Sequence, residues 1–222
     1  MDTKLLSLLF EATMDTLYMS IVSTGIATLL AIFPAILLIL CSPDGLSPNR
    51  LVFNVLDGII NTLRSFPFLI LMVVLFPFTQ WILGKSIGAS AAIVPLSIGA
   101  APFIVRILEN ALKEVDKGVI EAALSFGASN FQIIFKIMFV EALPSIVSGI
   151  TLALILVIGF SAMAGAVGGG GLGDIAIKYG YYRFQSDIML YTVLILVFLV
   201  HILQTIGDFC YKKLKNLNVK EK

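Results

Sequence analysis

The chain has 222 residues, of which 59% are hydrophobic and only 13% charged, and its mean hydropathy is +1.01. A water-soluble domain of this length has too little interior to bury so much apolar surface. The formal net charge is +1, and no basic stripe is present that would neutralise phosphates, which excludes a nucleic-acid partner. The composition indicates an all-α integral membrane protein in contact with lipid.

Five stretches of the chain contain no Asp, Glu, Lys or Arg. They are residues 16–43, 65–84, 86–105, 142–173 and 188–207. Each reaches or exceeds the ~20 apolar residues that a helix needs to cross about 30 Å of hydrocarbon. The short alternating segments of a transmembrane barrel are absent. The pattern predicts five transmembrane helices.

The regions around these spans suggest a simple organisation. Residues 1–15 are predicted to form a short amphipathic helix, with Leu5, Leu8, Leu9 and Ala12 on one face. The membrane domain is expected over residues 16–211, with a distinct polar region at 113–140, and residues 212–222 form a tail. Prolines inside the second and third spans interrupt backbone hydrogen bonds, so these spans are predicted to lie in the bundle interior.

Lys and Arg are distributed unevenly between the two sides that five spans define. One side, with the N-terminus, carries four of them, and the other carries eleven. The four are Lys4, Lys85, Lys178 and Arg183, and the eleven are Arg50, Arg64, Arg106, Lys113, Lys117, Lys136, Lys212, Lys213, Lys215, Lys220 and Lys222. Positive residues are enriched in cytoplasmic loops. We therefore expect the N-terminus outside, with the C-terminus and region 113–140 in the cytoplasm.

Region 113–140 is predicted to contain two short helices separated by Gly127. The first has Val115, Val119, Ala122, Ala123 and Phe126 near one face, and Gly127 is a natural C-terminal stop. Ser129 followed by Gln132 fits a capping box at the start of the second helix, which carries Phe131, Ile134, Phe135 and Met138. Such a pair of helices is suited either to docking in a groove of a partner protein or to lying on the membrane surface.

The fourth span ends in a run of small residues from Ser161 to Gly173. Gly165 and Gly169 have a G-x-x-x-G spacing, which allows helix backbones to approach closely. Packing is therefore one role of these glycines, and a flexible outer end that opens and closes around a solute is the other. The run lacks the Gly-Lys-Ser/Thr of a phosphate-binding loop, so no nucleotide site is expected.

No catalytic constellation is present in the sequence. One histidine, His201, and two distant cysteines are too few for a histidine-based metal site. Asp57 and Arg64 border the second span, where they could pair with neighbouring helices or extend to water. The middle of the membrane is expected to lack the ionisable groups of a proton- or sodium-driven carrier. The chain is therefore predicted to be no enzyme, to bind no metal or cofactor, and to take its energy from a separate ATPase.

Several motifs of the chain resemble those of importer-type ABC transporter permeases. Glu121-Ala-Ala, followed by Gly127 and Ile137, has the spacing of the EAA loop in that superfamily. The resemblance is closer to methionine importer permeases. It is carried by Arg64-Ser-Phe-Pro-Phe, Ala91-Ala-Ile-Val-Pro-Leu, Gly99-Ala-Ala-Pro-Phe, Glu109-Asn-Ala-Leu-Lys-Glu-Val-Asp, the run from Ser161 to Asp174, and Tyr179-Gly-Tyr-Tyr-Arg-Phe-Gln. It covers about residues 15–211. One departure is Val140, where family members commonly carry a proline, so re-entry into the fourth span is expected to bend at Pro144.

The resemblance implies a type I ABC importer permease fold with a cytoplasmic coupling helix, in a bacterial inner membrane. It further implies a homodimer that works with two ABC ATPase subunits, which hold ATP and Mg, and with an extracytoplasmic methionine-binding lipoprotein. Glu121, Ala122, Ala123 and Gly127 would dock on the ATPase, and Ser161, Met163 and Gly165 would line or gate the pathway. The same machine for another amino acid or a small dipeptide is the alternative. An autonomous channel or carrier and a scaffold without transport are the rivals from other classes.

Overall fold

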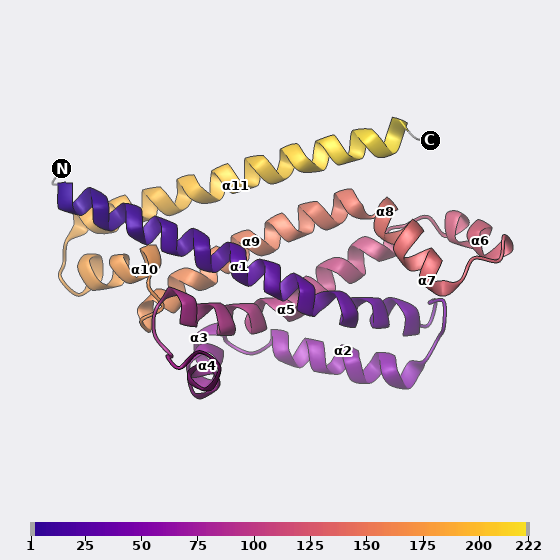
Figure 1. Cartoon of the computed structure of the whole chain (residues 1–222), viewed down its shortest axis with the longest axis horizontal. Coiled ribbons are helices and arrows are strands. Elements are labelled where there is room, and N and C mark those ends of the chain that lie inside the picture. The colour runs from indigo at the N-terminus through magenta and orange to yellow at the C-terminus, as the bar shows by residue number, and fades with distance from the viewer. Residues whose placement is uncertain (1–2, 221–222) are drawn as a thin grey trace.

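The computed structural model describes the backbone of residues 3–220 and the side chains of residues 3–217, and these residues form helices joined by short turns, without strands. Long helices lie side by side along one axis (Figure 1). The segments are α1 (Thr3–Cys41), α2 (Arg50–Arg64), α3 (Phe68–Val74), α4 (Phe76–Leu83), α5 (Ala89–Lys113), α6 (Lys117–Ser125), α7 (Asn130–Gln132), η1 (Ile133–Met138), α8 (Phe139–Glu141), α9 (Leu143–Ala166), α10 (Gly171–Ile175), η2 (Ala176–Tyr181) and α11 (Ser186–Lys220).

Helix α1 packs most extensively on α5, and the contact is made by small residues. Ala27, Ala31 and Ala35 recur every fourth residue and are fully buried. Small side chains let two helices approach closely inside a membrane. Within the segment predicted as an amphipathic helix, residues 1–15, Leu9 and Ala12 are buried against α10 and α11. However, the described part of this segment, from residue 3, is continuous with the first span and not a separate helix.

The second span differs in its bounds from the helical span predicted over residues 65–84. That stretch is divided into α3 and α4, and the candidate span is instead α2 followed by α3, with a bend of 97° between them. Proline explains both breaks. Pro67 adopts an extended conformation immediately before α3, and Pro77 lies in the first turn of α4. Proline has no N–H for the helical ladder and fixes its own φ, so it begins a helix readily but interrupts one that is already formed.

Within residues 3–220, four other helical stretches are long and apolar enough to cross a membrane, so the expected five spans are reached when the bent pair counts as one. They begin at Thr3, Ala89, Leu143 and Ser186. Helix α11 lies at the edge of the bundle and is the least buried of them (Figure 1). It continues to Lys220, so the described part of the expected tail, residues 212–220, extends the last span, and residues 221–222 lie outside the described part.

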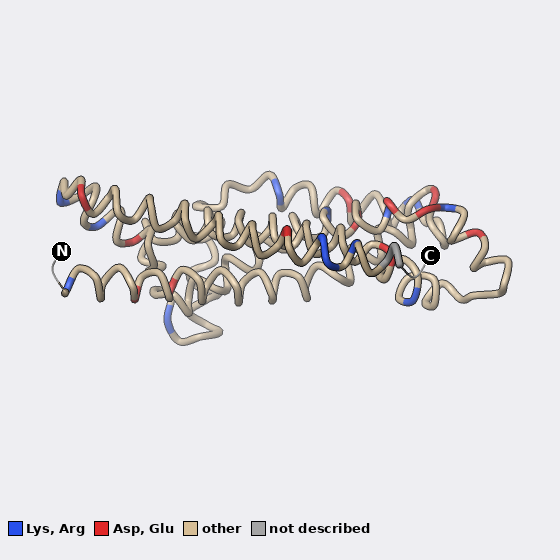
Figure 2. The backbone as a smooth tube through the Cα atoms, turned by 90° about the horizontal axis from the view of Figure 1, so that it is seen from above, with Lys and Arg blue, Asp and Glu red and all other residues tan. Residues whose placement is uncertain are grey.

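The charged residues mark the two ends of the bundle. Lys and Arg are concentrated in the half that carries the C-terminus and region 113–140 (Figure 2). Helix α2 lies in this half, whereas α3 and α4 lie in the other half, toward the N-terminus (Figure 1). The distribution along the axis therefore agrees with the assignment of the charged loops to two sides.

Candidate functional site

Helix α6 is defined by caps at both ends. The side chain of Asp116 accepts hydrogen bonds from the backbone N–H of Gly118 at 2.7 Å and of Val119 at 3.4 Å. At the other end Gly127 has φ +78°, its N–H donates to Leu124 O at 2.9 Å, and the next N–H donates to Ala123 O at 3.1 Å. These two bonds form a Schellman motif, which requires the left-handed conformation that glycine adopts most easily. The predicted helix stop at Gly127 is confirmed.

The second helix of this region starts with the predicted capping box. The hydroxyl of Ser129 accepts from the N–H of Gln132 at 3.3 Å, and the Gln132 amide oxygen accepts from the N–H of Ser129 at 2.9 Å. The helix then continues through the π-helical turn η1 into α8. It breaks at Ala142, just before Pro144 in the first turn of α9. The bend is thus two residues earlier than expected, because Pro144 has no N–H to donate to the carbonyl of Val140.

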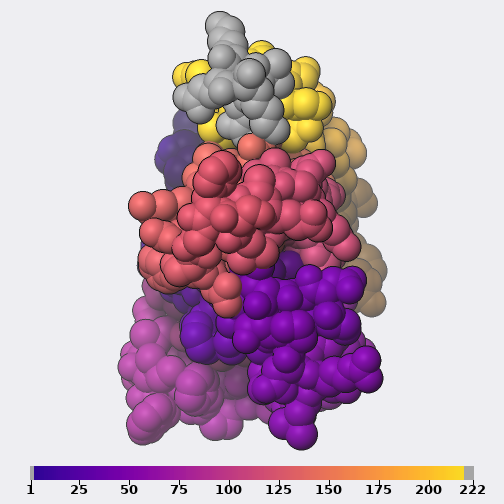
Figure 3. Space-filling model, turned by 90° about the vertical axis from the view of Figure 1, so that its right-hand side faces the viewer, coloured from indigo at the N-terminus to yellow at the C-terminus, as the bar shows by residue number. Residues whose placement is uncertain are grey.

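The four candidate docking residues lie at the surface of the end that carries region 113–140. Glu121, Ala122 and Gly127 are exposed and Ala123 is half-buried. Helix α6 has no fully buried residue, and Phe126 beside Gly127 is 91% exposed. The coupling region, residues 113–140, projects across the middle of the end face between α11 and α2 (Figure 3). Helix α6 therefore leaves Val119, Leu124 and the adjacent Phe126 exposed, as a docking element would require.

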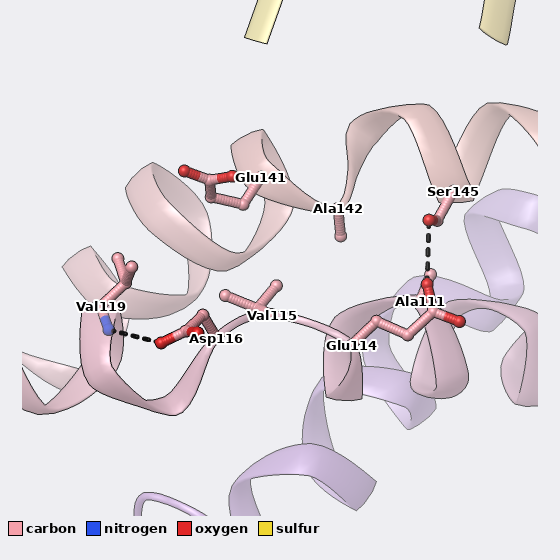
Figure 4. A pocket seen from close by; sticks show the side chains of 8 residues that line it. All are labelled: Ala111, Glu114, Val115, Asp116, Val119, Glu141, Ala142 and Ser145. Atoms are coloured by element: carbon pink, nitrogen blue, oxygen red, sulfur yellow. Dashed lines mark hydrogen bonds between the residues drawn. The ribbon is translucent and has the colours of Figure 1, made fainter. Parts of the chain in front are cut away.

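A pocket of about 240 Å³ separates α6 from the start of α9. Its walls come from the end of α5, the start of α6 and the turn into α9, and it includes three carboxylates (Figure 4). The lining residues are Ala111, Glu114, Val115, Asp116, Val119, Glu141, Ala142 and Ser145. Across it the Ser145 hydroxyl donates to Glu114 at 3.0 Å. This hydrogen bond links α9 to the residue that follows α5, at the start of region 113–140.

A charge cluster connects α2 to α5 one to two turns before the coupling region. Arg106 pairs with Asp57 of α2, donates to the Asn61 amide oxygen at 3.0 Å, and donates to Glu109 at 2.6 Å. Glu109 also accepts from Lys113 at 2.6 Å, and its side chain is only 2% exposed. The expected pairing of Asp57 with a neighbouring helix is confirmed. The role of Arg106 and Glu109 was missed, although the spacing of Arg106, Glu109 and Lys113 places all three on one helix face.

Arg64 is exposed on the single chain, and its guanidinium lies over an aromatic ring. Its guanidinium carbon is 5.3 Å from the centroid of the Phe103 ring. The ring centroids of Phe103 and Phe160 are 6.1 Å apart, and the Phe160 ring stacks on that of Phe68 with a centroid distance of 4.3 Å. Phe103 is near the middle of α5. The expectation that the middle of the membrane lacks ionisable groups stays a prediction.

The small-residue end of α9 is held by close backbone packing. A Cβ on Gly165 would lie 2.5 Å from the carbonyl carbon of Gly173 and closer still to the backbone nitrogen of Asp174. The N–H of Leu172 donates to the hydroxyl of buried Thr16 at 2.9 Å, which fixes α10 on α1. Packing is thus one role of Gly165. Ser161 is buried, with its hydroxyl bonded to Ile158 O at 2.8 Å, whereas Met163 is half exposed. Their assignment to a pathway stays a prediction.

The described residues contain no group of three or more His, Cys, Asp or Glu side chains that could hold a metal ion. Of the two cysteines, Cys41 is buried and Cys210 exposed. The candidate site combines exposed residues of region 113–140 at one end of the bundle with close glycine packing at the other end. The guanidinium of Arg64 lies between them.

Comparison with known proteins identifies the class of molecule that combines these features. Residues 27–216 match the model of the binding-protein-dependent transport system inner membrane components, and the chain belongs to this family. It is 47% identical to a probable D-methionine transport system permease protein of Vibrio cholerae, covering 90% of this chain and 89% of the relative. It is 43% identical to the methionine import system permease protein of Bacillus subtilis, covering 90% of each.

Solved structures agree with the family. A chain of the MetNI methionine ABC transporter in an inward-facing conformation superposes with a TM-score of 0.94 at 41% identity, covering 96% of this chain and 99% of that one. An amino acid ABC transporter superposes with a TM-score of 0.78 at 17% identity over 95% of each chain, which shows a shared fold. The expected ABC importer permease fold is confirmed, and the chain is an inner-membrane component of a transport system.

Proposed function

We propose that this chain is the membrane-spanning permease subunit of an ATP-driven methionine importer. The observation that carries the proposal is its 47% and 43% identity, over 90% of its length, to relatives named as methionine permeases. Two copies would form the pathway, two ABC ATPase subunits would bind and hydrolyse ATP with Mg, and an extracytoplasmic lipoprotein would deliver methionine. The exposed α6 with its cap at Gly127 is the surface suited to the ATPase.

The mechanism follows from how the coupling region is attached. Helix α6 contributes no buried residue to the bundle, whereas α5 and α9 on either side of it are tied by Glu114 and Ser145. Movement of the docked ATPase subunits would therefore displace α5 and α9 together, and the outer ends of these helices would open in exchange. The Lys and Arg distribution supports a cytoplasmic position for this end, with the N-terminus outside.

The experiment that tests the function is reconstitution of the permease with its cognate ATPase and binding protein in liposomes. Labelled methionine should accumulate only with ATP, and no uptake should occur with the permease alone. Accumulation of a different amino acid or dipeptide, and not of methionine, would favour the alternative substrate. Uptake by the permease alone would contradict the ABC mechanism, because an autonomous carrier needs no docked ATPase.

The Gly127→Ala variant tests the docking surface. A Cβ on Gly127 meets no atom within 4 Å, so the only cost of the change is the left-handed backbone, about 1–2 kcal/mol. The junction between α6 and α7 should relax to a different angle. The amount of methionine imported per ATP hydrolysed should then fall roughly fivefold to thirtyfold. Both rates are measured on the same proteoliposomes.

The matched control is Gly58→Ala in α2, where the Cβ again meets no atom within 4 Å but the residue is helical. Alanine is favoured there, so the transport ratio should stay at the wild-type value. An unchanged ratio in the Gly127 variant, with the change confirmed in the purified protein, would mean that the angle at Gly127 does not determine coupling.

A further inference from the structure

Arg64 lies at a depth where a charged side chain needs a specific reason to be. The Phe103 ring under its guanidinium is ten residues before Lys113, the last residue of α5. Phe103 itself lies inside the charge-free stretch 86–105, three residues before Arg106. Arg64 is also the last residue of α2, so it lies at the junction between the two halves of the bent candidate span and not at an end of that span.

Among the described residues Arg64 has no ion pair and no side-chain hydrogen bond, and its guanidinium lies over the ring of Phe103. Arg106, by comparison, contacts Asp57, Asn61 and Glu109. Arg64 is also exposed on the surface of the single chain. An arginine facing lipid at this depth is costly, and intramembrane charges almost always face a water-filled cavity or a bundle interior. The position is that of a group lining the pathway between two copies of the chain.

The backbone next to Arg64 supports the same placement. Residues 65–67 are the break between α2 and α3, where the axis turns by 97°. Irregular backbone is tolerated at membrane depth only where it is covered by protein or lines a cavity. Broken spans commonly form the solute sites of transporters. The Arg64 side chain thus leaves the chain at the point where a solute site would be built.

The chemistry of the group selects its ligand. A guanidinium carries a fixed fork of N–H donors that matches a carboxylate in a bidentate geometry. Its contact with the Phe103 ring holds the cation while leaving these donors free. We propose that Arg64 binds the α-carboxylate of the amino acid during its passage, one arginine from each copy of the chain facing the pathway. This inference rests on the proposed import function and adds the residue that recognises the substrate's charged end.

The test uses the complete complex of permease, ATPase and binding protein in proteoliposomes, with Arg64→Gln. Loss of a charge-assisted pair should reduce labelled methionine uptake roughly tenfold to a hundredfold. Arg64→Lys keeps the charge but loses the bidentate geometry of the guanidinium, so its methionine uptake should lie between those of Arg64→Gln and the wild type. Arg50→Gln removes the same charge at the opposite, exposed end of α2 and should leave uptake at the wild-type level.

Direct binding of labelled methionine to the detergent-purified permease–ATPase complex, with the ATPase alone as the blank, separates the possible anions. In the wild type, unlabelled methionine should compete and methioninol, which lacks the carboxylate, should not. The Arg64→Gln complex should lose both the binding and this discrimination. Dissociation of the permease dimer by the variant would assign Arg64 to a carboxylate of the partner copy. A defect that appears only when anionic lipid is varied would assign it to a phosphate headgroup. Either result would overturn the proposal.

Failure of this inference is distinguishable from failure of the proposed function. If the wild-type complex imports methionine and Arg64→Gln does so equally well, the function stands and the role of Arg64 is refuted. If the wild-type complex imports no amino acid with ATP, the function itself is refuted, whatever the variant does.

Discussion

Replacing Arg106 by leucine is expected to lower the thermal midpoint of the permease–ATPase complex by about 6–20 °C. Arg106 lies between two carboxylates, Asp57 of α2 and Glu109 of α5, and its side chain is 16% exposed. Without it, buried Glu109 keeps only the exposed ammonium of Lys113. Removing one partner of a buried pair costs about 3–5 kcal/mol, because the remaining charge is left without compensation. In a chain of this size 1 kcal/mol corresponds to roughly 2–4 °C.

Two further variants decide whether the uncompensated charge is the cause. Lys113 contacts the same carboxylate but is 48% exposed, so Lys113→Gln should cost no more than about 1 kcal/mol. The double variant Arg106→Leu with Glu109→Gln removes the orphaned charge together with its partner, and it should regain part of the lost stability. If Arg106→Leu and Lys113→Gln lowered the thermal midpoint equally, this account would be contradicted. A double variant that regained no stability would contradict it as well.

The cluster also has a functional consequence, because α2 carries Arg64 at its end. Apart from Ile60, no residue of α2 is buried, so its position on the bundle depends strongly on the bonds to Arg106. The same α5 that holds α2 continues directly into the coupling region. In the proposed mechanism, movement there would reach the break at residues 65–67 through Asp57 and Arg106. The cluster would then connect the proposed docking surface with the group proposed to bind substrate.

The sequence was sufficient where local chemistry decides the structure. The helix stop at Gly127 and the capping box of Ser129 and Gln132 depend on residues within one turn, and both were predicted correctly. Charge-free stretches located the other spans, because a bilayer excludes charge over a fixed thickness. The second span failed this rule, since its inner half, α2, contains Asp57 and its apolar half is divided by Pro67 and Pro77.

Contacts between helices could not be predicted from the sequence. The partner of Arg106 depends on which face of α2 turns to α5, and nothing within either helix specifies that register. The ring contact of Arg64 was missed for a related reason. Its place at the border of a charge-free stretch suggested only that it extends to water, and the packing of α2 on α5 brings it over Phe103. The roles of Ser161 and Met163 depend on the second copy, so they stay predictions.

The Gly165→Ala variant is expected to disrupt the outer end of the permease, although it adds only a methyl group. At Gly165 the nearest atoms are backbone atoms of Gly173 and Asp174, which cannot rotate away as a side chain can. Overpacking usually costs about 1–3 kcal/mol. Here α10 must separate from α9, so we expect at least the upper end of that range. A fall of about 6–12 °C in the thermal midpoint of the complex should follow.

Gly159→Ala provides the matched control in the same helix, because a Cβ there meets no atom within 4 Å. It should leave the midpoint and methionine uptake at the wild-type level, whereas Gly165→Ala should lower both. Separation of α10 would also strain the bond from Leu172 to Thr16, so the loss should extend to the contact with α1. A Gly165→Ala complex as stable as the Gly159→Ala complex would show that α10 can move away without cost. Gly165 would then be a site of flexibility at the outer end and not of fixed packing.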